Sequence, residues 1–407
     1  MPVYDTLQSE KNPVIFEFGT AYTKCGFTSE PSPRAIIPSE IYLNSIDKTL
    51  RIFQIKDVGL LIQALEKFIQ MIYFKYLAAN PKDRRVVIVE SIFSEKIFRQ
   101  QVAEVFFKRF NVPSLLFVPN HVVVMATLGI NTALVFDIGY AEAIAIPIYE
   151  GITILDSVQF APLGGKSLHL RIMDELIRRK PTFHQDGENV EINETTIDES
   201  NLEDIIFRTC FVTTFERGSQ LAQQKLTNKD EEEEESTDDD DRIQCSIKRP
   251  PPSVRYPFGG NKFLQIPGSL RESVCEVLFE MYGEEHTLAT LIIDSILKCP
   301  LDCRRRLAKN IVLIGGTSMI SGLKHRLYKE IEYLTTKSER YKPINFSNDF
   351  QFHQLPCKEN YASWLGASIW ATTDLLSMRS ITAEQFVKNN DTISDWSNFD
   401  FLISPTT

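Results

Sequence analysis

The chain has 407 residues, of which 43% are hydrophobic and 24% charged, and this is the composition of a globular protein long enough for two domains with buried cores. Its net charge is −10, and an acidic stretch from Asp230 to Asp241 holds ten carboxylates and no basic residue, so the rest of the chain is electroneutral and offers no basic surface for nucleic acid. The seven cysteines form no CxxC pair and the six histidines show no metal-ligand spacing, which argues against a zinc site and for free thiols in a reducing compartment.

The N-terminal third is predicted to alternate short strands with helices. Residues 1–11 lack the apolar segment of a secretory signal. Residues 12–27 predict a hairpin with a tight turn at Gly19. Helical spacing or short apolar runs predict four further elements: a helix at 60–77, a strand at 86–89, a helix at 95–110 and a strand at 115–118. This alternation of strands with helices favours an α/β architecture.

One apolar stretch, residues 115–139, is long enough to raise the question of a membrane helix. A proline and two polar residues interrupt it at 119–121, and Asn131 and Asp137 follow. Such groups are costly in lipid but are accommodated easily in a strand–helix–strand unit. We therefore interpret the stretch as part of an α/β core.

A second predicted hairpin, at residues 133–147, repeats the pattern of the first. In each, an apolar strand ends in a carboxylate and a glycine follows two residues on, at Glu17 and Gly19 and again at Asp137 and Gly139. Such a repeat suggests two related α/β halves, although a strand followed by a turn is a common pattern. The remaining predicted elements are helices at 166–179, 201–213, 269–281, 288–298, 301–309 and 361–376, and a strand at 311–314.

The acidic stretch, with its flanks at about residues 228–248, is predicted to be a disordered insertion. Its like charges repel, and it has too few apolar side chains to offset the entropy lost on ordering. A solvated insertion is the simpler interpretation, and a face for a basic partner is the alternative.

Three glycine-containing turns follow buried strands, at Gly19, at Gly139 and at Gly315-Gly316. Glycine lets backbone N–H groups approach phosphate oxygens. Each turn alone is more often an ordinary turn, but the three in this order predict a nucleotide cleft. Gly164-Gly165-Lys166-Ser167 imitates the end of a P-loop, yet Phe160 stands where the first glycine should be, so we interpret it as a turn before a helix.

Several motifs resemble those of the actin family, and they occur in the family's order. The similarity runs from about residue 14 to residue 377. The motifs are Phe16-Glu17-Phe18-Gly19-Thr20, residues 24–27 and 33–39, Pro147-Ile148-Tyr149-Glu150-Gly151, residues 313–319, and residues 361–366 with Trp364.

The resemblance implies an actin-like, ribonuclease-H-like fold with two α/β domains around a nucleotide cleft. Residues 1–128 and 361–407 are expected to form the small domain, with a reduced subdomain. Residues 129–360 are expected to form the large domain, which carries the acidic insertion.

The resemblance also implies a site for ATP or ADP with Mg²⁺. Eight positions retain the family's residues at this site. They are Gly19, Thr20 and Lys24 in the first phosphate loop, Asp137 and Gly139 in the second, and Gly316, Thr317 and Met319 at the adenine side.

Other positions depart from the family. Hydrolysis needs a positioned, polarised water, and two groups that the resemblance assigns to this water are lost: Asn120 replaces a glutamine and Ile144 replaces a histidine. The sequence is compatible with nucleotide binding but argues against turnover, so we expect no enzyme. The other departures are Glu17 for an aspartate, Tyr140-Ala141 for an Asp-Gly pair, Ile206-Phe207 for a Lys-Glu pair and Asn360 for a lysine.

Residues 40–57 fill the interval that in actin holds a small subdomain with a long loop, and that loop grips the neighbouring subunit. The interval allows one or two short strands and no projecting loop. A subunit built in this way can bind a filament through one end and offers no binding surface to the next subunit.

Residues 80–88, 128–131 and 314–319 resemble one branch of the family, the divergent actin-related proteins at the pointed end of the dynactin filament, tenth in the usual naming. This implies a non-catalytic cytoplasmic, cytoskeletal subunit that caps the filament and anchors the accessory subunits through which dynein engages cargo. Its partners would be these subunits, with no nucleic acid and no membrane insertion. Two alternatives stay open: a nuclear actin-related subunit of a chromatin remodeller, and an ATP-hydrolysing member of the actin and sugar kinase superfamily.

Overall fold

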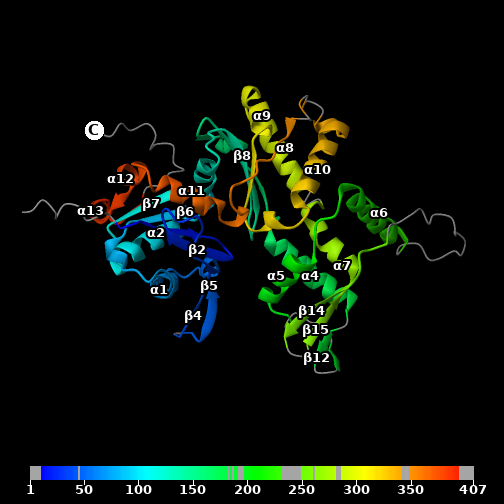
Figure 1. Ribbon diagram of the computed structural model, residues 1–407, viewed down its shortest axis with the longest axis horizontal. Coiled ribbons are helices and arrows are strands. Elements are labelled where there is room, and N and C mark those ends of the chain that lie inside the picture. The colour runs from blue at the N-terminus through cyan, green and yellow to red at the C-terminus, as the bar shows by residue number, and fades with distance from the viewer. Residues whose placement is uncertain are drawn as a thin grey trace, which may run out of the picture. The chain divides into compact units, whose positions relative to one another are not determined.

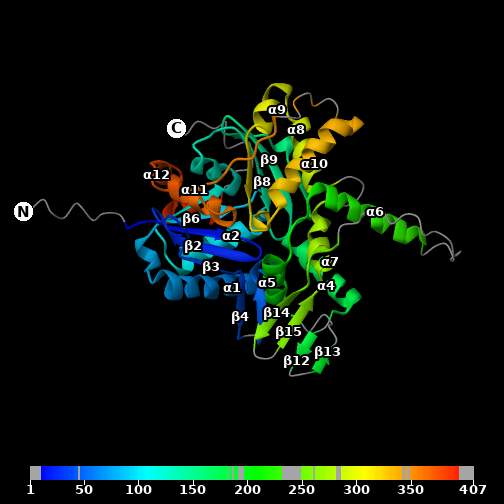
Figure 2. The same ribbon diagram turned by 45° about the vertical axis from the view of Figure 1, so that its right-hand side comes forward.

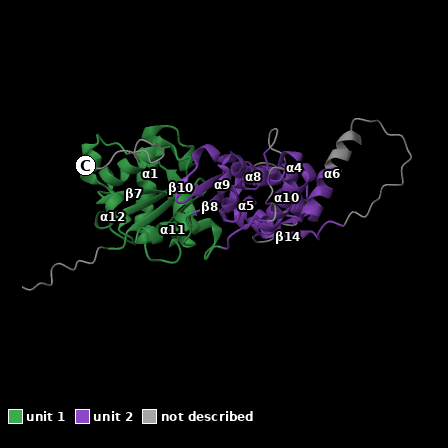
Figure 3. Cartoon of the chain, turned by 90° about the horizontal axis from the view of Figure 1, so that it is seen from above, with its two compact units in different colours: residues 1–131, 355–407 green, residues 132–354 purple. Residues whose placement is uncertain are grey.

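The computed structural model describes residues 11–44, 46–181, 183–185, 188–190, 197–231, 249–259, 262–280, 286–341, 344, 346 and 349–393. The chain divides into two compact units, unit 1 with residues 1–131 and 355–407 and unit 2 with residues 132–354 (Figure 3). Each unit combines helices with β-sheet (Figure 1), which confirms the predicted α/β class.

Unit 1 is built on a six-stranded sheet in the order β17-β7-β6-β1-β2-β3. Strands β1, β6 and β7 run parallel to one another, and β2 pairs antiparallel with β1 and β3. The predicted hairpin at 12–27 is therefore confirmed as β1 and β2. The strands are β1 (Val14–Phe18), β2 (Tyr22–Phe27), β3 (Ala35–Pro38), β6 (Val86–Glu90), β7 (Ser114–Pro119) and β17 (Ile381–Thr382).

Alternate side chains of this sheet belong to two different cores, because successive residues of a strand point to opposite faces. Phe16 and Ile88 pack with helices α1 (Val58–Met71) and α2 (Lys96–Glu104), whereas Ile15 packs with α11 (Ala362–Trp370). Each of the first two helices continues as a π-helix, over Ile72–Leu77 and Val105–Arg109, so the helices predicted at 60–77 and 95–110 are confirmed.

The single late helix predicted at 361–376 is wrong in its extent. Helix α11 ends at Trp370, and a separate helix, α12 (Leu375–Arg379), follows. Between them, Thr372 Oγ1 donates to the carbonyl of Ile369 and Thr373 Oγ1 to that of Trp370, both at 2.7 Å. Hydroxyls that bond nearby carbonyls compete with the helical pattern.

The short interval at 40–57 forms a two-stranded antiparallel sheet of β4 (Glu40–Leu43) and β5 (Lys48–Arg51). The connection between the strands is residues 44–47. Ile41 and Leu43 are buried in the same core as α1. The prediction of one or two short strands here is confirmed.

Unit 2 contains a five-stranded sheet in the order β10-β9-β8-β16, with β11 also pairing β9. The hairpin predicted at 133–147 is present as β8 and β9, and β16 runs parallel to β8. The strands are β8 (Ala133–Ile138), β9 (Ala143–Tyr149), β10 (Ile152–Thr153), β11 (Gln159–Ala161) and β16 (Ile311–Ile314).

The helices of unit 2 largely follow the predicted periodicity, with two exceptions. The helix predicted at 269–281 is α-helical only to Ser273 and continues as a 3-10 helix over Val274–Leu278. Helix α5 ends at Thr209, four residues before its predicted end. The backbone N–H groups of Phe211 and Val212 donate instead to the carbonyls of Arg271 and Ser321, so tertiary hydrogen bonds replace the helical ones. The helices are α4 (Gly165–Arg179), α5 (Glu199–Thr209), α6 (Phe215–Glu231), α7 (Gly268–Ser273), α8 (Leu288–Lys298), α9 (Leu301–Ala308) and α10 (Leu323–Lys337).

Two features of unit 2 were not predicted. Helix α6 extends to Glu231, so residues 228–231, expected to be disordered, are helical. The rest of the predicted acidic insertion, residues 232–248, lies outside the described residues. A second, four-stranded sheet has the order β13-β12-β15-β14 (Figure 2), with β12 at Phe183–Gln185, β13 at Glu188–Val190, β14 at Val254–Gly259 and β15 at Lys262–Ile266.

The apolar stretch at 115–139 folds as β7, a short helix α3 (Asn120–Val123) with the 3-10 turn after it, and β8. Within the described ranges, every helix is too short or too polar to span a membrane.

Candidate functional site

The first glycine loop, in unit 1, joins β1 to β2. The N–H of Gly19 donates to the carbonyl of Tyr22 at 3.1 Å, and a Cβ at Gly19 would lie 2.7 Å from that carbonyl oxygen, so the turn requires glycine. Ser39 Oγ donates to the carbonyl of Gly19 at 2.6 Å and fixes the loop to the end of β3. Thr20 lies in the turn itself and is partly buried.

Lys24 is paired within this hairpin. The strand register places it opposite Glu17, and its Nζ forms an ion pair with Glu17 Oε1. The two side chains are 13% and 14% exposed. The second carboxylate oxygen, Glu17 Oε2, is buried and has no hydrogen-bond partner in the described part of the chain. The positive charge that the sequence assigned to phosphate binding is therefore already neutralised by the residue that replaces the family's aspartate.

The second glycine loop, in unit 2, lies where β8 ends. Its turn closes through the N–H of Gly139, which donates to the carbonyl of Glu142 at 2.9 Å. The Gly139 carbonyl accepts from Thr317 Oγ1 at 2.7 Å and from the N–H of Gly165 at 3.1 Å. The loop is thus bonded both to the turn after β16 and to the start of α4.

The third turn lies at the same sheet edge because β16 pairs with β8 and places Ile314 beside Asp137. Gly315 has a φ of +95°, and a Cβ there would lie 2.7 Å from Asp137 Oδ1, so glycine is required by both conformation and space. Gly316 faces open space, since no atom lies within 4 Å of a Cβ built on it. Met319 ends the following 3-10 turn and is 36% exposed.

The eight predicted site residues therefore form two groups. Gly19, Thr20 and Lys24 belong to unit 1, and the other five are gathered at the β8 and β16 edge of unit 2. The unit 2 group contains groups of the kind that Mg²⁺ and phosphate bind: Asp137 carries a carboxylate, and the space next to Gly316 is open. In unit 1 the fit is poorer, because Lys24 would have to exchange Glu17 for phosphate.

The residues at the two lost water-orienting positions are turned inward. Asn120 begins α3, and its Oδ1 accepts from the N–H of His121 at 2.7 Å. Ile144 lies opposite Asp137 in the β8–β9 register and is 2% exposed. Burial lowers the pKa of His121 to about 4, so its imidazole is neutral at pH 7.

Two further contacts had no signal in the sequence. Tyr140 of the second loop donates its hydroxyl to Glu199 of α5, a residue 59 positions later. Lys67 of α1 donates its Nζ to the carbonyl of Tyr42 at 2.7 Å and to Asn44 Oδ1 at 3.0 Å, at the tip of the β4–β5 hairpin. Only the tertiary structure brings these pairs together.

Comparison with known proteins gives matches that span most of the chain. A family model described as actin matches residues 8–391. "Actin-related protein 10" of Dictyostelium discoideum is 28% identical over 451 aligned positions, which cover 95% of this chain and 89% of the relative. These matches bear out the predicted resemblance and the actin-like fold, and the relative's name carries the number of the branch that the motifs resemble.

Proposed function

The chain belongs to the actin family, and from this premise we propose that it is a non-catalytic structural subunit capping the pointed end of the short actin-related filament of dynactin. In this role it anchors the pointed-end accessory subunits in the cytoplasm and so supports dynein-driven transport on microtubules. Unit 1 is then the small actin-like domain with its reduced subdomain, and unit 2 is the large one. The similarity to "Actin-related protein 10" supports this branch of the family.

The observation that carries the proposal is the β4–β5 hairpin. Its strands are joined by residues 44–47, and its tip is held down on α1 by the two hydrogen bonds of Lys67. Tyr42 also donates its hydroxyl to Asp47 across the turn. A head-to-tail polymer grows only when each subunit offers two complementary faces. A subunit whose hairpin is short and tied down lacks one of them, so it ends the filament.

The capping role is tested with the purified full-length chain. Sedimentation should show a monomer at concentrations at which actin polymerises. Mixed with the filament-forming subunit of dynactin, the labelled chain should bind sub-stoichiometrically and only at pointed ends in electron micrographs. A chimera in which a long actin-type loop replaces residues 44–47 should gain self-association, whereas Lys67→Ala, which frees the tip without lengthening it, should stay monomeric.

Filaments of the wild-type chain alone would contradict the proposal. Label along filament sides or at barbed ends would do the same, because it would show that the missing loop does not define the binding position.

For the nucleotide, we propose that Gly19, Thr20, Lys24, Asp137, Gly139, Gly316, Thr317 and Met319 hold ATP or ADP with Mg²⁺ where one is bound. The metal ion would neutralise phosphate charge. The chain's own residues would bind and orient the nucleotide. The inward-turned Asn120 and the apolar Ile144 support a role without hydrolysis.

A further inference from the structure

The second glycine loop rests directly on the first turn of α4. The N–H groups of Gly165 and Lys166 donate to the carbonyls of Gly139 and Tyr140 at 3.1 and 2.8 Å. A Cβ at Gly164 would lie 2.6 Å from the Gly139 oxygen, so only glycine permits this approach. The first donors of a helix bind anions when they are free. Here two of them are already used by the loop.

The side chain of Tyr140 extends the contact to α5. Its hydroxyl donates to Glu199 Oε1, and the same oxygen lies 3.3 Å from Nδ1 of His169 on α4. The rings of Tyr140 and His169 meet edge to face with centroids 5.4 Å apart. His169 is 8% exposed, and Glu199 is the first residue of α5, where the helix dipole favours a carboxylate. Three elements are therefore joined at one carboxylate oxygen.

We infer that Tyr140, Glu199 and His169 form a latch that holds the second glycine loop on α4 and α5 without nucleotide. In a nucleotide-dependent loop, phosphate oxygens supply the contacts that order the turn. Here the hydrogen bonds from the N–H groups of α4 to the carbonyls of Gly139 and Tyr140 fix the backbone of the loop. The hydrogen bond from the Tyr140 hydroxyl to Glu199 fixes the side chain of the loop. The latch lies within unit 2 and does not depend on the proposed capping role.

Hydrogen–deuterium exchange of the full-length chain tests the latch. Two peptides report on it: one covering residues 138–143, which contains the Gly139 amide bonded to Glu142, and one covering the first turn of α4. In EDTA without nucleotide the wild type should protect both, and adding Mg²⁺ with ATP should change neither more than twofold. Tyr140→Phe keeps the ring and removes the hydroxyl, so exchange in both peptides should rise about fivefold, as expected for one net hydrogen bond.

Two further variants separate the latch from a general loss of stability. Tyr333→Phe makes the same chemical change on α10, at a side chain 48% exposed, and should leave both peptides unchanged. Glu199→Gln keeps an acceptor but removes its charge and should give a smaller rise than Tyr140→Phe. The inference is overturned if the wild-type peptides exchange freely until ATP is added, or if Tyr140→Phe matches the wild type.

Discussion

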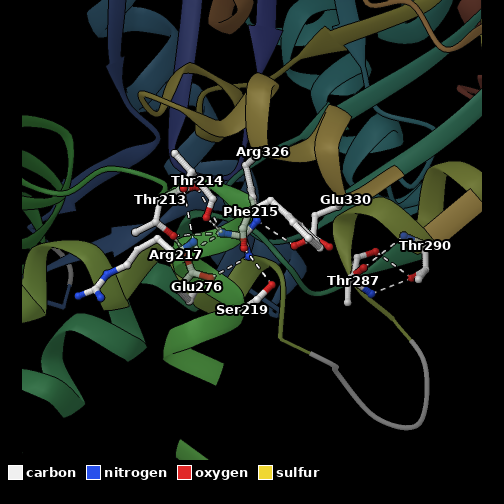
Figure 4. Close-up of polar contacts among 10 residues, drawn as sticks. All are labelled: Thr213, Thr214, Phe215, Arg217, Ser219, Glu276, Thr287, Thr290, Arg326 and Glu330. Atoms are coloured by element: carbon white, nitrogen blue, oxygen red, sulfur yellow. Dashed lines mark hydrogen bonds and ion pairs between the residues drawn. The ribbon is translucent and has the colours of Figure 1, made fainter. Parts of the chain in front are cut away.

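Arg326 carries a buried positive charge that ties three segments of unit 2 together (Figure 4). From α10, its guanidinium donates to both oxygens of Glu276 at 3.1 and 3.0 Å, and its Nε donates to Glu330 at 2.8 Å. It also donates to the carbonyl of Thr213 at 3.3 Å, in the connection between α5 and α6. The side chain is 4% exposed.

We expect Arg326→Met to lower the free energy of unfolding by about 3–5 kcal/mol, because it leaves the buried carboxylate of Glu276 and the partly buried one of Glu330 without their cation. The measurement is urea denaturation followed by circular dichroism. Lys329→Met is the matched control, since its ion pair with Glu332 is 39% exposed on both sides, and solvent screening should make its loss much smaller than that of Arg326→Met. Equal losses for the two variants would contradict the assigned role of Arg326.

His121 gives the stability of the protein a specific pH dependence. Its pKa is lowered from 6.5 to about 4 by burial, so the folded state binds fewer protons than the unfolded state once the pH falls below 6.5. The free energy of unfolding therefore decreases progressively as the pH falls from about 6.5 to about 4. Through this group alone, the free energy of unfolding should fall by about 2 kcal/mol between pH 7 and pH 5.

The contribution of His121 is measured as a difference, because other groups titrate in the same range. Urea denaturation of the wild type and of His121→Gln at both pH values gives it, and the variant should lose about 2 kcal/mol less on acidification. Parallel pH profiles would show that His121 is not the group responsible.

Helix α11 approaches α3 so closely that one glycine is required at the contact. A Cβ at Gly366 would overlap the carbonyl of Val123 and lie 2.9 Å from the N–H nitrogen of Val124. We expect Gly366→Ala to push the two helices apart and to cost about 1–3 kcal/mol of unfolding free energy. Gly59→Ala in α1 is the control, because a Cβ there meets only Asp57 Oδ1, at 3.4 Å. It should be neutral or stabilising by up to about 1 kcal/mol.

For the whole protein, we expect no ATP turnover above background. Ile144 has no polar group with which to orient a water, and the amide oxygen of Asn120 is bonded to the backbone of His121. A multiple-turnover phosphate-release assay should give the same rate for the wild type and for Asp137→Ala. An actin-like rate in the wild type that disappears in the variant would mean that the chain is an ATPase after all.

Local patterns in the sequence determined most individual elements. The period of apolar residues placed α8 at Leu288–Lys298, and apolar runs that end in a carboxylate and a glycine placed both hairpin loops. These features depend only on residues close in the sequence, because the spacing of apolar side chains and the positions of glycines can be read from the sequence directly. The actin-family motifs added the fold class, because they occur in a fixed order along nearly the whole chain.

Contacts between distant residues were decided only by the tertiary structure. The early end of α5 depends on carbonyls of Arg271 and Ser321, and the four-stranded sheet joins residues 183–190 with residues 254–266. The Tyr140–Glu199 bond and the Lys67 contact with the hairpin tip likewise join residues far apart in the chain. Hydrogen-bond partners of this kind leave no periodic signal, since a single donor and acceptor meet only when packing has placed the elements that carry them.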